Sequence, residues 1–237
     1  MKSLVQIREE IGDCRRCPLH TDRKKIVFGE GNPDAPVMFV GEGPGAQEDA
    51  TGRPFVGPAG LLLDKMIVAM GYDRADVYIS NIVMCRPPEN RIPDLHEVEM
   101  CRIFLEQKIQ IIDPKVIVSL GATARFALLG ASGPLGAARG KFVTWKPRPP
   151  SPEALSAKPR FEEDPEPPAI DRAYLKKHAA RKTFWSFHGI PVMPTWHPAY
   201  LLRNSAAKPE AAADLKKVVL ELARLGEPTR YPGALVL

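Results

Sequence analysis

Four short apolar runs, separated by stretches with helical periodicity, constrain the fold of this chain more than any other feature. The first three are continuous and rich in β-branched residues, which is typical of parallel strands buried on both faces of a sheet. The alternation of strand and helix therefore predicts an α/β protein in which helices cover a mainly parallel, four-stranded sheet. The expected strands are residues 37–40, 77–80, 116–120 and 191–194, and the expected helices are residues 60–70, 94–112, 122–129 and 214–225.

The length of 237 residues suits one α/β domain with a decoration, or at most two small domains. Residues 1–10 have the pattern of an amphipathic helix and not of a signal peptide, because no apolar core segment follows them. No stretch approaches the roughly 18 apolar residues of a membrane span. We therefore expect a soluble, cytoplasmic protein. The net charge of +5 favours a polyanionic partner only modestly.

The four cysteines of the chain combine one tight pair with two dispersed residues. Cys14 and Cys17 form a C-x-x-C pair whose sulfurs can face one metal centre, whereas Cys85 and Cys101 stand far apart. A zinc ribbon usually joins two tight pairs, so this spacing favours an iron–sulfur cluster held by thiolates from separate loops. Zinc remains the alternative metal. Buried apolar cysteines or two disulfides would need no metal, and the lack of a secretory signal disfavours disulfides.

Polar side chains follow each expected strand at the point where it ends. Residues 41–45, of sequence Gly-Glu-Gly-Pro-Gly, follow the first strand, Asn81 the second, residues 121–123 the third and His197 the fourth. Ligands of open parallel sheets bind beyond the carboxyl ends of the strands, so an acid, an amide and an imidazole should converge on one edge. Residues 41–45 lack the spacing of a dinucleotide fingerprint or a P-loop, which argues against a nucleotide cofactor.

Each of these residues also has a purely structural interpretation. Asn81 could cap a helix or complete a turn, and His197, which precedes a proline, could be a structural residue of its loop. Phe55 lies in a stretch too rich in glycine and proline for a helix. It could plug the core or provide a stacking platform for a base.

Several motifs, taken together, make the chain resemble the family 4 uracil-DNA glycosylases. The resemblance implies a three-layer α/β/α fold, a single monomeric domain over residues 1–237, and removal of uracil from single- or double-stranded DNA to leave an abasic site. It also implies that the four cysteines hold a [4Fe–4S] cluster. An iron–sulfur module that binds damaged or single-stranded DNA without cleavage is the alternative function. The segments that carry the resemblance are residues 41–45, Glu48 and Asp49, residues 52–57, Asn81, residues 85–88 and residues 197–200.

The resemblance assigns a role to each residue of a uracil pocket. Phe55 would stack on a flipped-out uracil, and Asn81 would read its imide edge with an amide that donates and accepts. His197 and backbone N–H groups near Gly43 would stabilise the negative charge of the leaving base. Glu42 would position the attacking water and balance the charge of the sugar. The implied uracil-binding set is Gly41, Glu42, Gly43, Glu48, Phe55, Asn81 and His197, with Glu42 and His197 catalytic and Glu48 blocking the methyl group of thymine.

Two further segments are expected to contact DNA, and the identity of the general base is not settled by the residue at position 43. One of two adjacent leucines must point outward, and Leu201 is predicted to fill the space that the flipped base vacates, with Arg203 on the flanking phosphate. Residues 145–185 form a proline-rich, then basic insertion, whose return into the strand before His197 places it near the DNA. Other uracil glycosylases carry an acidic residue at the position of Gly43, so the identity of the general base stays open.

Overall fold

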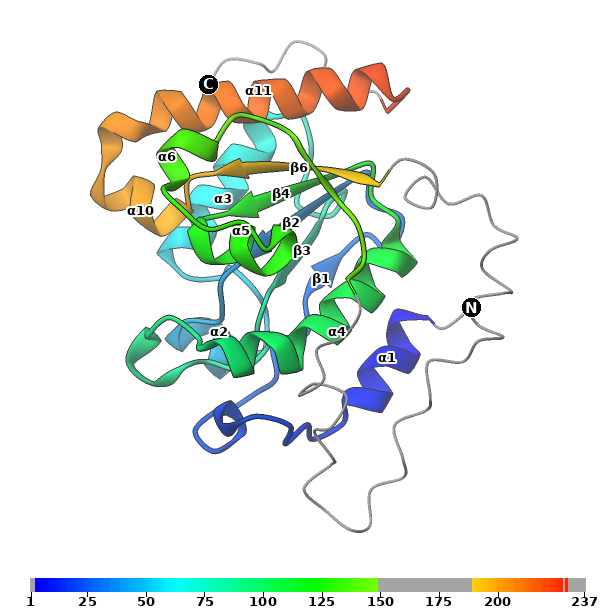
Figure 1. Cartoon of the computed structure of the whole chain (residues 1–237), viewed down its shortest axis with the longest axis vertical. Coiled ribbons are helices and arrows are strands. Elements are labelled where there is room, and N and C mark those ends of the chain that lie inside the picture. The colour runs from blue at the N-terminus through cyan, green and yellow to red at the C-terminus, as the bar shows by residue number, and fades with distance from the viewer. Residues whose placement is uncertain (1–2, 149–188, 228, 230–237) are drawn as a thin grey trace.

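The structure is a computed structural model that describes residues 3–148, 189–227 and 229. Most of the predicted insertion, including its basic second half, lies outside these residues. Figure 1 shows a central sheet between two sets of helices. The predicted α/β class, with helices on both faces of the sheet, is therefore confirmed. No helix within the described ranges is long and apolar enough to cross a membrane.

The sheet has six strands in the order β1-β3-β2-β4-β6-β5. The four inner strands are parallel, and the two edge strands run antiparallel to their neighbours. The inner strands match the predicted ones to within a residue at each end. They are β2 Val37–Gly41, β3 Tyr78–Asn81, β4 Val116–Leu120 and β6 Ile190–Thr195.

Two short edge strands, β1 Glu30–Gly31 and β5 Val143–Trp145, extend the sheet beyond the prediction. The expectation of a four-stranded sheet is wrong in number, because strands this short carry no periodic pattern. Trp145 pairs with Ile190 and is only 1% exposed. It therefore belongs to the core, and the insertion begins after it and not at it.

Alternate residues of the inner strands point to opposite faces of the sheet. On β2, Met38 and Val40 join one buried cluster, and Val37 and Phe39 join the other. Three helices pack on the first cluster, namely α1 Leu4–Ile11, α4 Leu95–Ile112 and α5 Ala122–Leu129. Three others pack on the second cluster, namely α3 Pro58–Ala69, α10 Pro198–Arg203 and α11 Lys208–Arg224. The connections contain α2 Ala46–Thr51, α6 Leu135–Ala138 and the 3-10 turns Pro18–His20, Pro88–Asn90 and Ser205–Ala207.

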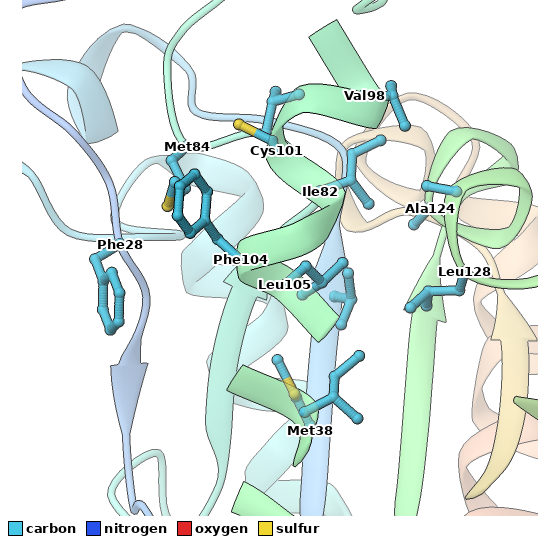
Figure 2. Close-up of a cluster of buried hydrophobic side chains, with 14 of the residues drawn as sticks. Phe28, Met38, Ile82, Met84, Val98, Cys101, Phe104, Leu105, Ala124 and Leu128 are labelled. Carbon is cyan, nitrogen blue, oxygen red and sulfur yellow. The ribbon is translucent and has the colours of Figure 1, made fainter. Parts of the chain in front are cut away.

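Helix α4 begins with a capping box. The Asp94 side chain accepts from the Glu97 N–H at 2.8 Å, and the Glu97 side chain accepts from the Asp94 N–H at 2.8 Å. From this start the helix presents Cys101, Phe104 and Leu105 to the buried side (Figure 2). The cap therefore helps to fix the register in which Cys101 faces the protein interior.

Helix α11 begins at Lys208, earlier than the predicted start at Asp214. A proline in the first helical turn makes this start possible, because no intrahelical hydrogen bond is lost there. Asp214 is instead buried within the helix. Its carboxylate accepts from the Thr195 hydroxyl at 2.7 Å and from the Arg139 guanidinium at 2.7 Å, which ties α11 to the end of β6.

Candidate functional site

A cavity of about 590 Å³ opens where the inner strands end, and we call it the strand-end cavity. It contains a carboxyl, an amide, a hydroxyl and an imidazole from four different connections. Gly41 and Leu201 are not in its wall. Of the residues predicted to bind uracil or DNA, Glu42, Gly43, Glu48, Phe55, Asn81, His197 and Arg203 line it.

Gly41, the last residue of β2, lies where two pocket side chains come closest to the backbone. A Cβ at this position would lie 2.5 Å from Cζ of Phe55 and 2.6 Å from Oδ1 of Asn81. Both distances are far below van der Waals contact. Gly41 therefore makes room for Phe55 and Asn81 and does not itself line the cavity.

Asn81 ends β3 and is 2% exposed. Its Oδ1 is buried and has no hydrogen-bond partner among the described residues. An unsatisfied buried acceptor typically costs about 1–3 kcal/mol, and at the wall of a cavity a bound ligand can offset that cost. This acceptor is suited to an N–H donor of a planar ligand in the cavity.

Phe55 has φ of +49°, an unfavourable backbone conformation for a side chain of this size. Its ring centroid lies 5.7 Å from that of His197. The backbone of Phe55 also packs closely on α3, because a Cβ at Gly60 would lie 1.9 Å from the Phe55 carbonyl oxygen. Strain of this kind is retained where the surroundings impose it, and it is typical of binding sites.

Glu48 holds the loop that carries Phe55. Its carboxylate accepts from the Gly45 N–H at 3.1 Å, the Val56 N–H at 2.9 Å and the Gly57 N–H at 2.8 Å. Both oxygens are therefore engaged with backbone, and Glu48 clamps the two sides of the cavity mouth together. Sequence reasoning gave Glu48 only a steric role, which remains a prediction.

His197 precedes α10 and caps its first turn. Its Nδ1 accepts from the Ala199 N–H at 3.1 Å, so the ring proton of the neutral imidazole lies on Nε2. Burial lowers the pKa of His197 to about 4, and the nearby Arg203 charge contributes. Gly121 has φ of +93° and lies close to His197. A Cβ at position 121 would be only 3.3 Å from the His197 Cβ, so the glycine leaves room for the histidine. The arrangement presents a neutral N–H donor at neutral pH.

Thr123 is a site residue that sequence reasoning did not assign to a role. Its hydroxyl donates to Oε2 of Glu42 at 2.5 Å, and both residues line the strand-end cavity. In the sequence, only the position of Thr123 shortly after the end of β4 indicated that it could belong to the site. A hydroxyl at such a position has many uses, so its role could not be assigned. The hydrogen bond fixes one carboxylate oxygen of Glu42 and thereby orients the other.

The structure places the two leucines of α10 opposite to the prediction. Leu201 is 1% exposed and packs in the cluster beneath α3, whereas Leu202 is 48% exposed. The expectation that Leu201 points outward is therefore wrong, since α10 is held against α3 by that side chain. Arg203 lines the rim of the strand-end cavity.

The four cysteines, here called the cysteine centre, converge below the start of α4. Cys17, Cys85 and Cys101 are buried in one cluster and Cys14 packs against it, all as free thiols. Burial raises the pKa of Cys17 to about 12, against a backbone hydrogen bond from Leu19 that lowers it, and the neighbouring Cys85 and Cys14 raise it further. Burial likewise raises the pKa of Cys101. Buried thiolates of this kind need a compensating positive charge.

Polar groups that suit an anionic centre surround these thiols. Arg23 donates to Sγ of Cys85 at 3.6 Å and to the Cys14 carbonyl at 2.6 Å. The Met84 backbone forms a hydrogen bond with Cys101. Across the described ranges, no three His, Cys, Asp or Glu side chains meet closely enough to hold a single metal ion. The four thiols share one cluster of side chains, and as thiolates beside an arginine N–H donor they have the chemistry that iron or zinc binds.

A short segment connects the cysteine centre to the strand-end cavity. The Lys24 N–H, next to Arg23, donates to the buried carboxylate of Asp49 at 2.9 Å. Asp49 lies beside Glu48 on α2, the helix that organises the cavity mouth. The two sites therefore share one structural link.

Comparison with known proteins gives consistent matches. The family model for the uracil DNA glycosylase superfamily matches residues 28–222. A Type-4 uracil-DNA glycosylase of Thermotoga maritima is 39% identical over 216 residues, which are 91% of this chain and 88% of that protein. A Type-4 uracil-DNA glycosylase of Sulfurisphaera tokodaii is 37% identical over 223 residues, 92% of this chain and 84% of that protein. One of Archaeoglobus fulgidus is 50% identical over 127 residues, 54% of this chain and 62% of that protein.

Proposed function

We propose that this chain, which belongs to the uracil DNA glycosylase superfamily, is a DNA-repair hydrolase that removes uracil from DNA and leaves an abasic site. The observation that carries the proposal is the buried, unpartnered Oδ1 of Asn81, a residue that lines the same cavity as Phe55 and His197 with its neutral N–H donor. One cavity therefore combines an amide that can recognise a base, an aromatic ring that can stack on it and an N–H donor for the leaving group.

Recognition of uracil follows from the amide of Asn81. Its Oδ1 accepts the uracil N3–H, and its NH₂ group donates to uracil O4. Cytosine presents an acceptor and a donor in the reverse order, so the same amide would face two unfavourable pairings. Phe55 stacks on the ring, and Glu48 stands at the mouth where the methyl group of thymine would enter.

The bond from C1′ of the sugar to N1 of uracil breaks with its electron pair on the base. Negative charge then develops on N1 and O2 of the uracil. The Nε2–H of His197 and backbone N–H groups near Gly43 stabilise that charge without transferring a proton to the base. A neutral imidazole suits this role, since burial keeps His197 unprotonated at neutral pH.

A water molecule adds at C1′ as the base leaves, and one of its protons is released. Glu42 positions this water and balances the positive charge of the sugar. Thr123 holds Oε2 of Glu42, so the second oxygen can face the water. Positioning of this kind contributes to the rate because the reacting groups are already aligned.

The cysteine centre is proposed to hold a [4Fe–4S] cluster through Cys14, Cys17, Cys85 and Cys101. When bound, the cluster supplies a structural cross-link and no chemistry at the base. The donors from Arg23 and the Met84 backbone support the proposal, because they stabilise the negative charge of thiolate-bound iron. We also propose that the protein acts as a monomer, as a single domain and in the cytoplasm.

A cleavage assay tests the function directly. The protein is incubated with a single-stranded and a double-stranded oligonucleotide that each contain one uracil, and the products are treated with alkali. We expect cleavage at the uracil in both, and none in matched substrates with thymine or cytosine. Tight binding of these oligonucleotides without release of free uracil would favour the non-catalytic binding module instead.

Replacing Thr123 by Val is expected to slow single-turnover excision about 10- to 100-fold, because a hydrogen bond to a charged group is typically worth about 1.5–3 kcal/mol. The Michaelis constant should change little, since Thr123 does not read the base. Thr123→Ser keeps the hydroxyl and should restore most of the rate. In a Glu42→Gln background, Thr123→Val should cause no comparable further loss, and a fully additive loss would contradict the link between the two residues.

Leu202 is the exposed leucine of α10, so we propose it as the side chain that occupies the space left by the flipped base. Leu202→Ala should lower excision from duplex DNA far more than from single strands, because a single strand needs little unstacking. Leu201→Ala is the matched control. It should destabilise the fold by roughly 2–5 kcal/mol and affect both substrates alike. Equal losses of excision rate on both substrates in Leu202→Ala would show that Leu202 does not occupy the space left by the flipped base.

A further inference from the structure

A second hollow, which we call the α5 groove, lies beside the strand-end cavity and has a volume of about 360 Å³. It runs along α5, between that helix and the segment that leads into α4. Ala122 and Thr123 line both hollows, so the groove lies directly next to the strand-end cavity. Its wall consists of Ile92, Pro93, Leu95 and Val98 on one side and of Arg125, Phe126 and residues 131–133 with the start of α5 on the other.

The groove concentrates exposed apolar surface. Ile92 is 67% exposed, Leu95 is 61% exposed and Phe126 is 40% exposed. Three exposed apolar side chains around one hollow provide a surface on which an apolar ligand can pack. An aromatic ring among aliphatic side chains suits a flat, weakly polar ligand.

The wall of the groove is held in shape by a buried arginine. Arg125 is 4% exposed, and its Nη2 donates to the carbonyls of Ala131 at 3.1 Å, Ser132 at 2.6 Å and Gly133 at 2.9 Å. The two N–H groups of this nitrogen, one of them shared between two carbonyls, hold the loop of residues 131–133 in place. The hollow is therefore preformed, which lowers the entropic cost of binding.

We propose that the α5 groove receives the base of the nucleotide adjacent to uracil in the same DNA strand. The inference rests on the proposed function. A uracil in the strand-end cavity is covalently joined to its neighbours, and the strand must leave the cavity along an open path. The α5 groove begins at the cavity wall, so a neighbouring base reaches it without any second binding event.

Stacking supplies the reason for such a base to stay in the groove. In a single strand the neighbouring base is unpaired, and its faces are open to water. Packing it against Phe126, Ile92 and Leu95 removes apolar surface of both partners from water. In a duplex the neighbouring base stays paired with the opposite strand, so the groove contributes to single-stranded substrates above all.

The test uses single-stranded oligonucleotides in which an abasic spacer replaces the nucleotide on the 5′ side or the 3′ side of uracil. The wild-type protein should lose roughly tenfold in kcat/KM with the spacer on one side only, a loss of the size that base–aromatic stacking typically gives. In Phe126→Ala this penalty should fall below about twofold, while the substrate with the spacer on the other side behaves as in the wild type.

Leu220→Ala is the matched control, because Leu220 is 58% exposed on α11, which packs on the opposite face of the sheet. It should retain the full spacer penalty. If wild-type protein excises uracil but shows the same rate with every spacer, or if Phe126→Ala keeps the penalty, the inference is overturned and the proposed function stands. Either result is also expected if another copy of the chain occupies the groove. Lack of any excision by wild-type protein would instead refute the proposed function.

Discussion

Replacing His197 by Ala is expected to slow single-turnover release of uracil by roughly 100- to 1000-fold, the usual effect of losing one preorganised donor to a developing anion. The structure presents this donor in a fixed form. Nδ1 is occupied by the Ala199 N–H, so Nε2 carries the proton, and the low pKa keeps the ring neutral. Binding of uracil-containing DNA should change much less than the rate, because the charge develops only as the bond breaks.

The same substitution also removes the cap of α10, and a second variant separates the two effects. His197→Ala should lose about 0.5–2 kcal/mol of stability with the cap. Serine is a good cap whose short side chain cannot reach the base, so His197→Ser should lose the rate and keep most of the stability. Excision by His197→Ala within about twofold of wild type would contradict the donor role, which predicts a far larger loss.

Replacing Cys101 by Ala is expected to reduce bound iron from about four atoms per chain to nearly none, because a cubane is held by four thiolates. Cys101 is the proposed ligand on α4, and the other three proposed ligands lie on segments that precede that helix. Losing it should therefore remove one cross-link between the N-terminal segment and the helical layer and lower the thermal midpoint. Iron content and visible absorbance after anaerobic purification measure the first effect, and thermal unfolding measures the second.

Met100→Ala is the matched control on the same helix. Met100 is 2% exposed, and shortening it should cost roughly 2–5 kcal/mol of stability through the cavity it leaves. Iron should nevertheless stay bound, since no thiolate is lost. Stoichiometric zinc without iron in anaerobically purified wild-type protein would rule out the cluster.

The inner sheet and its polar strand ends could be predicted from the sequence because each inner strand is a buried apolar run with a polar residue directly after it. The edge strands could not, since β1 has two residues and β5 has three. Thr123 was visible at a strand end, but its bond to Glu42 depends on how α5 approaches β2. That approach is a property of packing and not of local sequence.

The two leucines of α10 show a limit of periodicity. The helix Pro198–Arg203 has six residues, fewer than two turns, and contains no repeating pattern that would separate a buried side from an exposed one. Leu201 and not Leu202 is buried, because the packing of α10 against α3 covers that side of the helix. Sequence reasoning could state only that one of two adjacent leucines must face outward.

The argument that placed the insertion near the DNA is wrong in its premise. Trp145 and Ile190 flank the insertion and pair with each other at the start of β6. His197 follows the other end of that strand. The insertion therefore leaves and rejoins the fold at the amino edge of the sheet, a strand length away from the strand-end cavity. Its return into β6 gives no reason for its basic residues to meet DNA.

The close approach at Gly41 limits how this site can change over evolutionary time. A single added methyl group would collide with both the ring of Phe55 and the amide oxygen of Asn81, so any other residue at position 41 must displace one or both side chains. Variation at position 41 can therefore remove activity but cannot shift it gradually toward another base. New specificities in descendants of this chain should instead arise at position 81, where a side chain, the amide of Asn81, is proposed to read the base.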